Sequence, residues 1–162
     1  MKAPTPTQVL AALVALPLVA VGIALVSQHG FDMQPCPWCV LQRLIFVAIA
    51  LVAAIGLAWR SAVAARVVPL AVEVLSACGI ATALWQHFVA ARSSSCNLTL
   101  ADRIMTASGL PAWLPEVFEA RASCADAAVD MLGVPYALWG LAVFVVIGAA
   151  ASWLLLRNRR PT

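Results

Sequence analysis

Two cysteines separated by two residues, Cys36 and Cys39, lie where a short polar connection gives way to a long apolar run. Prolines frame the first cysteine, and no charged residue occurs from Leu44 to Trp59, so a membrane helix is expected to begin at about Cys39. A Cys-X-X-Cys pair at a helix N-terminus favours the reactive thiolate. The spacing therefore indicates a redox-active dithiol near the boundary between water and lipid.

Arg43 follows Cys39 by four positions, on the same helix face and one turn deeper. A fixed cation at this place stabilises a thiolate. An arginine inside a membrane helix is costly and therefore indicates a functional site. The alternative is an arginine whose side chain extends back to the outer surface of the membrane.

A structural use of the first cysteine pair is less favourable than a redox use. A disulfide across so few residues closes a very small loop and adds little stability through chain entropy, whereas a labile redox couple needs no large loop. Zinc is the other use of this spacing. It would require distant segments to bring further ligands together, and the candidates are Cys96, Cys124, His29 and His87.

The remaining cysteines are Cys78, Cys96 and Cys124. Cys96 and Cys124 fall in one long connection, and a disulfide between them, beside one between Cys36 and Cys39, is the simplest arrangement. Four cysteines nevertheless allow three different pairings. A purely structural disulfide between Cys96 and Cys124 remains an alternative. Cys78 lies among small residues inside an expected membrane helix, so we expect it to be an inert packing residue.

The elements that must position these cysteines are membrane helices. The chain has 162 residues, of which 64% are hydrophobic and 10% charged, whereas soluble domains carry about 25% charged residues. The composition predicts an all-α, polytopic membrane protein with a four-transmembrane-helix bundle, forming a single membrane domain over residues 1–162. No patch interleaves basic and aromatic residues, so nucleic-acid binding is not expected.

Four apolar runs predict the spans, and two longer connections join them on one side. The helices are expected at about residues 9–27, 39–59, 67–88 and 134–156, with connections at about 28–38 and 89–133. The first run is too long for a cleaved signal peptide and lacks a convincing cleavage site.

The distribution of cations predicts the orientation of the bundle. Most of them fall at the termini and the short middle link: Lys2, Arg60, Arg66, Arg157, Arg159 and Arg160. The positive-inside rule then puts both termini in the cytoplasm and both cysteine-bearing connections outside.

The long outer connection is expected to contain a short amphipathic helix after Pro111. Trp113, Leu114, Val117 and Phe118 fall on one face of such a helix. This face would lie on the outer leaflet or pack onto the helix bundle.

A dithiol that generates disulfides must pass its electrons onward. The sequence carries no flavin, nucleotide or haem motif, so a lipid-soluble quinone is the acceptor that fits. Arg43 would supply hydrogen-bond donors and a permanent charge to the quinone carbonyls. His87, at the outer end of the third helix, would donate a hydrogen bond or proton, although its position also suits an ordinary residue of the membrane interface.

Motifs along nearly the whole chain resemble the disulfide bond formation protein B family (DsbB), the membrane enzymes that reoxidise the periplasmic oxidant DsbA with quinone. The resemblance is carried by Pro35-Cys36-Pro37-Trp38-Cys39 with Gln42-Arg43, His87, Cys96, Trp113-Leu114-Pro115, Cys124, Leu132-Gly133 and Trp139. Trp38 departs from the aliphatic residue that is more usual between the two cysteines, which could alter the redox potential or the fit to a partner but removes no reacting group.

The resemblance implies a route for the electrons. Cys96 would form the mixed disulfide with a DsbA-like thioredoxin-fold protein, and Cys124 would be its exchange partner. Cys36 would link the two pairs by exchange with Cys124, and Cys39 would face ubiquinone or menaquinone beside Arg43 and His87. The protein would then lie in the bacterial inner membrane, with its cysteine loops in the periplasm and access to the quinone pool.

Two other interpretations remain open. A vitamin-K-epoxide-reductase-like protein also places a Cys-X-X-Cys beside a quinone, but there the redox dithiol lies late in the chain. A non-catalytic membrane scaffold would use the outer disulfides only for stability and would need no electron acceptor.

Overall fold

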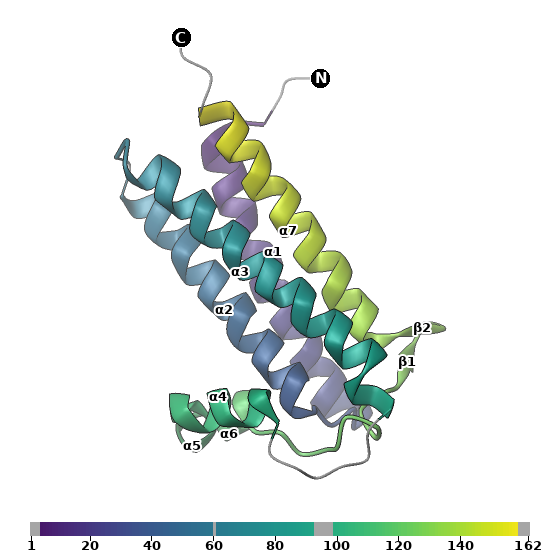
Figure 1. Cartoon of the computed structure of the whole chain (residues 1–162). Helices are drawn as coiled ribbons and strands as arrows, with labels where there is room; N and C mark the ends of the chain where they lie inside the picture. Colours follow the sequence, from purple (N-terminus) through teal and green to yellow (C-terminus); the bar gives the residue numbers. More distant parts are fainter. Residues whose placement is uncertain (1–3, 60, 93–98, 159–162) are drawn as a thin grey trace.

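The computed structural model describes residues 4–59, 61–92 and 99–158 and shows a bundle of four long helices (Figure 1). They are α1 (Pro6–Phe31), α2 (Pro37–Ala58), α3 (Ala64–Phe88) and α7 (Tyr136–Asn158). Each is long and apolar enough to cross a membrane. The prediction of a four-helix membrane bundle is confirmed.

The ends of the helices differ from the predicted ones where capping residues and prolines act. Helix α1 begins at Pro6, because Thr5 caps it through a capping box with Gln8. Helix α2 begins at Pro37 rather than at Cys39, since proline suits the first helical position. Helix α1 also continues to Phe31, so the first connection is shorter than predicted.

The four helices close into a ring in which α1 contacts α2, α2 contacts α3, α3 contacts α7, and α7 contacts α1. In the core, the rings of Phe46 and Phe144 stack with their centroids 4.0 Å apart. A Cβ atom at Gly79 would lie 2.3 Å from the ring of Phe144, so only glycine lets α3 approach α7 this closely. Small residues at such contacts are typical of helix packing in membranes.

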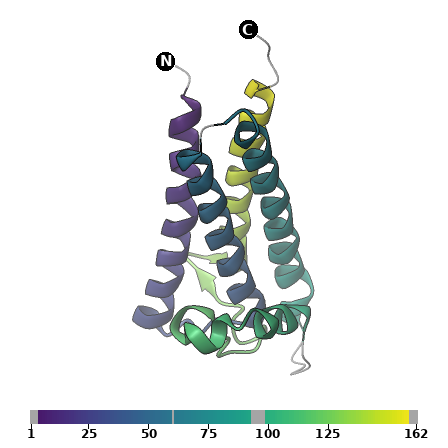
Figure 2. The ribbon, with the colours of Figure 1, turned by 90° about the vertical axis from the view of Figure 1, so that its left-hand side faces the viewer.

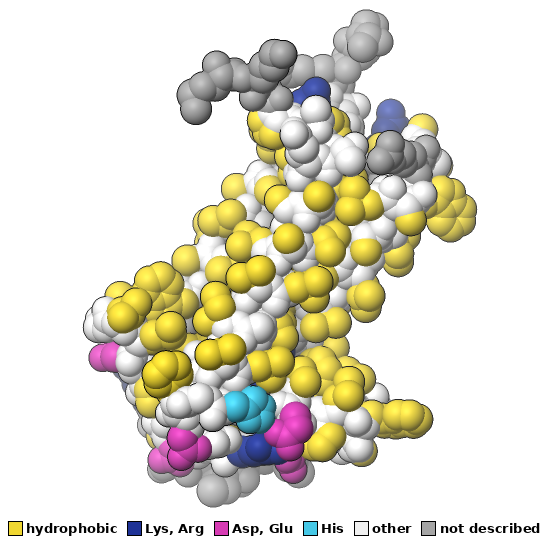
Figure 3. Space-filling model, turned by 180° about the vertical axis from the view of Figure 1, so that it is seen from behind, with side chains coloured by type: hydrophobic (Ala, Val, Ile, Leu, Met, Phe, Trp, Pro, Cys, Tyr) yellow, Lys and Arg dark blue, Asp and Glu magenta, His cyan; other side chains and the backbone are white. Residues whose placement is uncertain are grey.

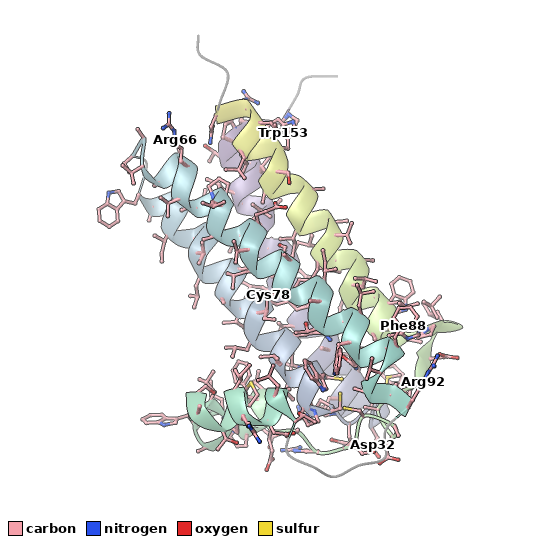
Figure 4. All side chains as sticks on the ribbon, in the orientation of Figure 1. Asp32, Arg66, Cys78, Phe88, Arg92 and Trp153 are labelled. Atoms are coloured by element: carbon pink, nitrogen blue, oxygen red, sulfur yellow. The ribbon has the colours of Figure 1, made fainter. Side chains whose placement is uncertain are left out.

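On the face of the molecule seen in Figure 3, hydrophobic side chains cover the middle and charged side chains gather at the ends. Arg66 lies at one end, and Asp32 and Arg92 lie at the other (Figure 4). The start of α1 and the end of α7 lie together, since Arg157 Nη1 donates to the Pro4 carbonyl at 2.8 Å. Both cysteine-bearing connections are at the opposite end, which we call the cysteine end. Which side of a membrane this end faces stays a prediction.

The connection between α3 and α7 contains several short elements. They are the 3-10 turn η1 (Ala90–Arg92), α4 (Leu100–Ser108), α5 (Leu110–Trp113), α6 (Pro115–Phe118), β1 (Asp130–Met131) and β2 (Val134–Pro135). The segment from α4 to α6 crosses the cysteine end of the bundle (Figure 2).

The prediction that one short amphipathic helix follows Pro111, with a single apolar face, is wrong. Two four-residue helices, α5 and α6, meet at Leu114, which has φ −135° and ψ 66° because the following Pro115 disfavours the helical conformation there. Phe118 is buried against the bundle, whereas Trp113 is 84% exposed. The amphipathic helix of this connection is instead α4, which the sequence analysis missed and which Thr99 and Asp102 begin with a capping box.

Strands β1 and β2 form a tight hairpin directly before α7. Its turn residues, Leu132 and Gly133, both have positive φ angles of 57° and 76°, as a two-residue hairpin turn of this kind requires. Trp139 Nε1 donates to the Met131 carbonyl at 3.2 Å and ties the hairpin to α7.

Candidate active site

Cys36 and Cys39 lie together at the start of α2. Cys36 is the N-cap residue, and its sulfur accepts a hydrogen bond from the backbone N–H of Cys39 at 3.4 Å. The two sulfur atoms are 2.9 Å apart. Cys36 is fully buried and Cys39 is half-buried. The helix start therefore holds the two thiols against each other with only one of them accessible.

Cys124 reaches the same place from the long connection, and its side chain is hydrogen-bonded with Cys36. The segment before it is fixed by two backbone hydrogen bonds, because the N–H groups of Arg121 and Ala122 donate to the Pro35 carbonyl at 2.9 and 3.2 Å. These contacts between segments far apart in the sequence place Cys124 beside the Cys36/Cys39 dithiol.

These contacts give the thiols of Cys36 and Cys124 different reactivities. The hydrogen bond with Cys124, a second one with Cys39, and burial raise the pKa of the Cys36 thiol above its usual range. The hydrogen bond with Cys36 lowers the pKa of Cys124. Cys36 therefore retains its proton, and Cys124 is the better nucleophile of the two, since the thiolate is the reactive form.

Arg43 is 5% exposed, and its side chain does not extend to the surface. Its Nη1 donates to Gln28 Oε1 at 2.7 Å and to the Val117 carbonyl at 3.0 Å, and its Nη2 donates to the Ala24 carbonyl at 3.4 Å. The buried charge is thus held by acceptors from α1 and α6, as a charge inside a membrane protein requires. Arg43 also links the connection between α3 and α7 to the dithiol helix.

Two glutamines complete the polar groups around Cys39, and the sequence analysis missed their role. Gln86 Nε2 donates to the Cys39 sulfur at 3.0 Å, and Gln42 Nε2 donates to Gln86 Oε1 at 2.6 Å. Both side chains are buried. A polar residue within an apolar membrane run was the only signal in the sequence, and it does not reveal the partner.

A cavity of about 290 Å³ opens beside Cys39. Its wall is mostly apolar, and residues of the hairpin β1–β2 and of α1 and α7 contribute to it. Its lining includes five residues with polar or sulfur side-chain atoms from α2, α3 and α7, namely Cys39, Gln42, Arg43, Gln86 and Tyr136. A flat apolar molecule with a few hydrogen-bonding atoms suits such a wall.

A second, wider groove of about 1130 Å³ runs along a different face of α2. Trp38 and Leu41 line it, together with residues of α3 and α4, and Cys124 lies in its wall. Cys39 and Cys124 are therefore reached from two separate hollows.

The structure does not bring every predicted site residue to this place. His87 does not line the cavity, and its ring packs against Phe88 with the centroids 4.8 Å apart. Its contact with an acceptor stays a prediction. Cys96 lies outside the described residues. Cys78 was expected to be buried, which is wrong, because it is exposed on the bundle surface about halfway along α3 (Figure 4).

Comparisons with known proteins show the family to which the chain belongs. Residues 6–154 match the family model described as disulfide bond formation protein DsbB. Disulfide bond formation protein B of Burkholderia pseudomallei (strain 1106a) is 32% identical over 152 residues, covering 93% of this chain and 89% of the relative. The protein of the same name in Pseudomonas syringae pv. tomato is 31% identical over 144 residues, covering 88% and 85%.

A third relative, disulfide bond formation protein B of Herminiimonas arsenicoxydans, is 32% identical over 148 residues, with 91% and 92% covered. The match extends over the four membrane helices and both cysteine-bearing connections, so it includes the whole site. The chain belongs to the DsbB family of disulfide bond formation proteins.

Proposed function

We propose that this membrane protein oxidises a soluble, DsbA-like dithiol protein and passes the electrons through two cysteine pairs to a membrane quinone. Its family membership supports a disulfide-forming oxidoreductase. The observation that carries the electron route is the position of Cys36, which contacts both Cys39 and Cys124. A thiol that touches a sulfur atom on each side can exchange disulfides between the two connections.

The route begins at the second pair. A thiolate of the partner attacks Cys96 in the Cys96–Cys124 disulfide and releases Cys124 as a thiolate. Cys124 then attacks Cys36 in the Cys36–Cys39 disulfide and releases Cys39 as a thiolate. Each step forms one disulfide bond and breaks one, so no net oxidation occurs yet.

The remaining exchanges separate the products. The second thiol of the partner displaces Cys96, and the partner leaves as a disulfide. Cys96 then attacks Cys124 and releases Cys36, which leaves Cys36 and Cys39 as a dithiol. Reoxidation of this dithiol sends two electrons and two protons to the quinone and yields the quinol.

The cavity beside Cys39 fits a quinone ring. Its wall is apolar, the accessible sulfur of Cys39 lies in it, and Arg43 and Gln42 add hydrogen-bonding atoms. A quinone supplies a two-electron acceptor that dissolves in the membrane. Arg43 would bind a ring carbonyl and stabilise the thiolate of Cys39. We propose ubiquinone or menaquinone as the acceptor.

Separate access suits two reaction partners of different kinds. Cys124 lies in the wall of the wide groove, whereas Cys39 lies in the cavity. A soluble protein would approach from the cysteine end, and the quinone would enter from the membrane. We propose that the cysteine end faces the periplasm of a bacterial inner membrane and that both termini lie in the cytoplasm.

A turnover assay on detergent-purified protein tests this function. A reduced thioredoxin-fold dithiol protein and a soluble ubiquinone or menaquinone analogue are supplied, and quinone reduction is followed. Cys36→Ser and Cys39→Ser should abolish turnover. Cys78→Ser is the matched control, because this cysteine, although it also lines the wide groove, lies about halfway along α3 and has no described hydrogen bond to another thiol, so turnover should be unchanged.

Loss of turnover in both dithiol variants and not in the control would support the electron route. Full activity in Cys36→Ser would contradict it, because no exchange between the two connections would then be needed. If folded wild-type protein reduced neither analogue, the disulfides would be structural, and the scaffold interpretation would hold instead.

A further inference from the structure

The side-chain amide of Gln86 is the polar group that α3 contributes to the Cys39 sulfur. Gln86 is 5% exposed, and its Nε2 lies 3.0 Å from Cys39 Sγ. Among the described residues, Cys36 is the other side chain hydrogen-bonded to this sulfur. In the proposed electron route, Cys36 is joined to Cys124 at the moment when Cys39 is a thiolate. Gln86 then remains as the direct side-chain donor.

Arg43 does not replace this donor. Its Nη1 and Nη2 groups donate to Gln28, Val117 and Ala24. These hydrogen bonds are directed to α1 and α6 rather than to the Cys39 sulfur. The charge of Arg43 acts on the thiolate through space, whereas Gln86 contacts the sulfur itself. The two residues therefore have different effects on Cys39.

The orientation of the Gln86 amide is fixed by its neighbours. Gln42 Nε2 donates to Gln86 Oε1 at 2.6 Å, which leaves the N–H groups of Gln86 to face the sulfur. Gln42 itself lies close to α7. A Cβ atom added at Gly140 would lie only 2.8 Å from Gln42 Oε1, so the absence of a side chain at Gly140 leaves room for the Gln42 amide. A thiolate accepts hydrogen bonds and donates none. The amide is thus oriented for the deprotonated form of Cys39.

We propose that Gln86 is a positioning residue that stabilises the Cys39 thiolate and so sets the reduction potential of the Cys36/Cys39 pair, with Gln42 fixing the direction of its amide. This inference rests on the proposed function for its role in turnover. The contact and its effect on the potential do not depend on a quinone. A hydrogen bond to the reduced form makes the disulfide easier to reduce, so it raises the potential.

The test is a redox titration with glutathione in the absence of quinone. The full-length protein in detergent carries Cys96→Ser and Cys124→Ser. Cys36 and Cys39 are then the remaining cysteine pair at the cysteine end. Gln86→Met, which keeps the length of the side chain and removes the donor, should shift the thiol–disulfide equilibrium about tenfold towards the disulfide. This shift corresponds to about 30 mV for a two-electron couple.

Gln42→Met should shift the equilibrium in the same direction by a smaller factor, and it serves also if Gln86→Met does not fold. Thr82→Val is the matched control on α3, since the described hydrogen bond of Thr82 goes to the Gly79 carbonyl and not to Cys39. The alkylation rate of Cys39 at neutral pH, measured with Cys36→Ser, should fall about tenfold in Gln86→Met and stay constant in the control.

An unchanged potential in folded Gln86→Met and Gln42→Met would overturn the inference, as would an equal shift in Thr82→Val, which would indicate a packing effect. Failure of the proposed function is distinguishable, because it would abolish quinone reduction in wild-type protein and leave this titration unaffected.

Discussion

The hydrogen bond between Arg43 and Gln28 predicts that a single substitution on α1 will loosen the connection between α3 and α7. Gln28 is 2% exposed, accepts from Arg43 Nη1 at 2.7 Å, and donates through Nε2 to the Glu116 carbonyl at 3.3 Å. It does not line the cavity beside Cys39. Gln28→Leu should therefore release α6 from the bundle without removing a group from the cavity.

The expected size follows from the bonds that are lost. A hydrogen bond to a charged group stabilises by about 1.5–3 kcal/mol and a neutral one by about 1 kcal/mol. Arg43 keeps its bonds to the Val117 and Ala24 carbonyls in the variant, so the loss is expected near about 2 kcal/mol. The open population of the segment should then rise about 30-fold, since about 1.4 kcal/mol is a factor of ten.

Trypsin cleavage after Arg121 measures this opening. In the closed state the N–H groups of Arg121 and Ala122 donate to the Pro35 carbonyl, so the bond between them is cleaved only after the segment separates from the bundle. When opening is fast, the cleavage rate follows the open population. Mass spectrometry of the fragments that begin at Ala122 should show them forming about 30-fold faster in Gln28→Leu.

The control removes a glutamine at the other end of α1. Gln8 belongs to the capping box there, and Gln8→Leu should leave cleavage after Arg121 at the wild-type rate. If Gln28→Leu were cleaved within about twofold of wild type, a difference below about 0.5 kcal/mol, the Arg43–Gln28 bond would have no part in holding the connection between α3 and α7.

Two further predictions concern the thiols and the packing of the bundle. The hydrogen bond from Cys36 lowers the pKa of Cys124, so alkylation of Cys124 should reach half its maximal rate at a lower pH than alkylation of a free thiol. Cys36→Ala should move that midpoint to higher pH. An unmoved midpoint would contradict this contact. A Cβ atom at Gly79 would lie 2.3 Å from Phe144, so Gly79→Ala should destabilise the bundle by about 1–3 kcal/mol in thermal unfolding, whereas Gly22→Ala, with no heavy atom within 4 Å of its Cβ position, should not.

The sequence predicted those parts of the fold that depend on local pattern. Four apolar runs form four helices, and the dithiol lies at the start of the second, because hydropathy and proline placement act over a few residues. Helix α4 was missed although Thr99 and Asp102 carry the spacing of a capping box. This signal spans only a few residues of a mixed polar and apolar connection, so it is weak beside the long apolar runs.

The contacts of the site depend on residues that are distant in the chain, and the sequence alone does not specify them. Arg43 was expected beside Cys39, yet its partners come from Gln28 on α1 and from the Val117 carbonyl of α6. His87 was predicted to lie beside the quinone because histidine can donate a proton, whereas the residue of α3 that lines the cavity is its neighbour Gln86. One position along a helix turns the side chain by about 100°, so the choice between neighbours needed the packing of α3 against α2.

Elementary physical chemistry nevertheless singles out the glutamines of the membrane helices. A side-chain amide inside a membrane must find hydrogen-bond partners, because lipid offers none. Gln28, Gln42 and Gln86 all lie at the cysteine end of predominantly apolar helices, and all three are buried and hydrogen-bonded. Gln28 binds the buried charge of Arg43, and Gln86 binds the sulfur of Cys39. The buried charge and the reactive sulfur are thus both held by neutral amides, which can fix a charge and a thiol close together without adding a second charge to the site.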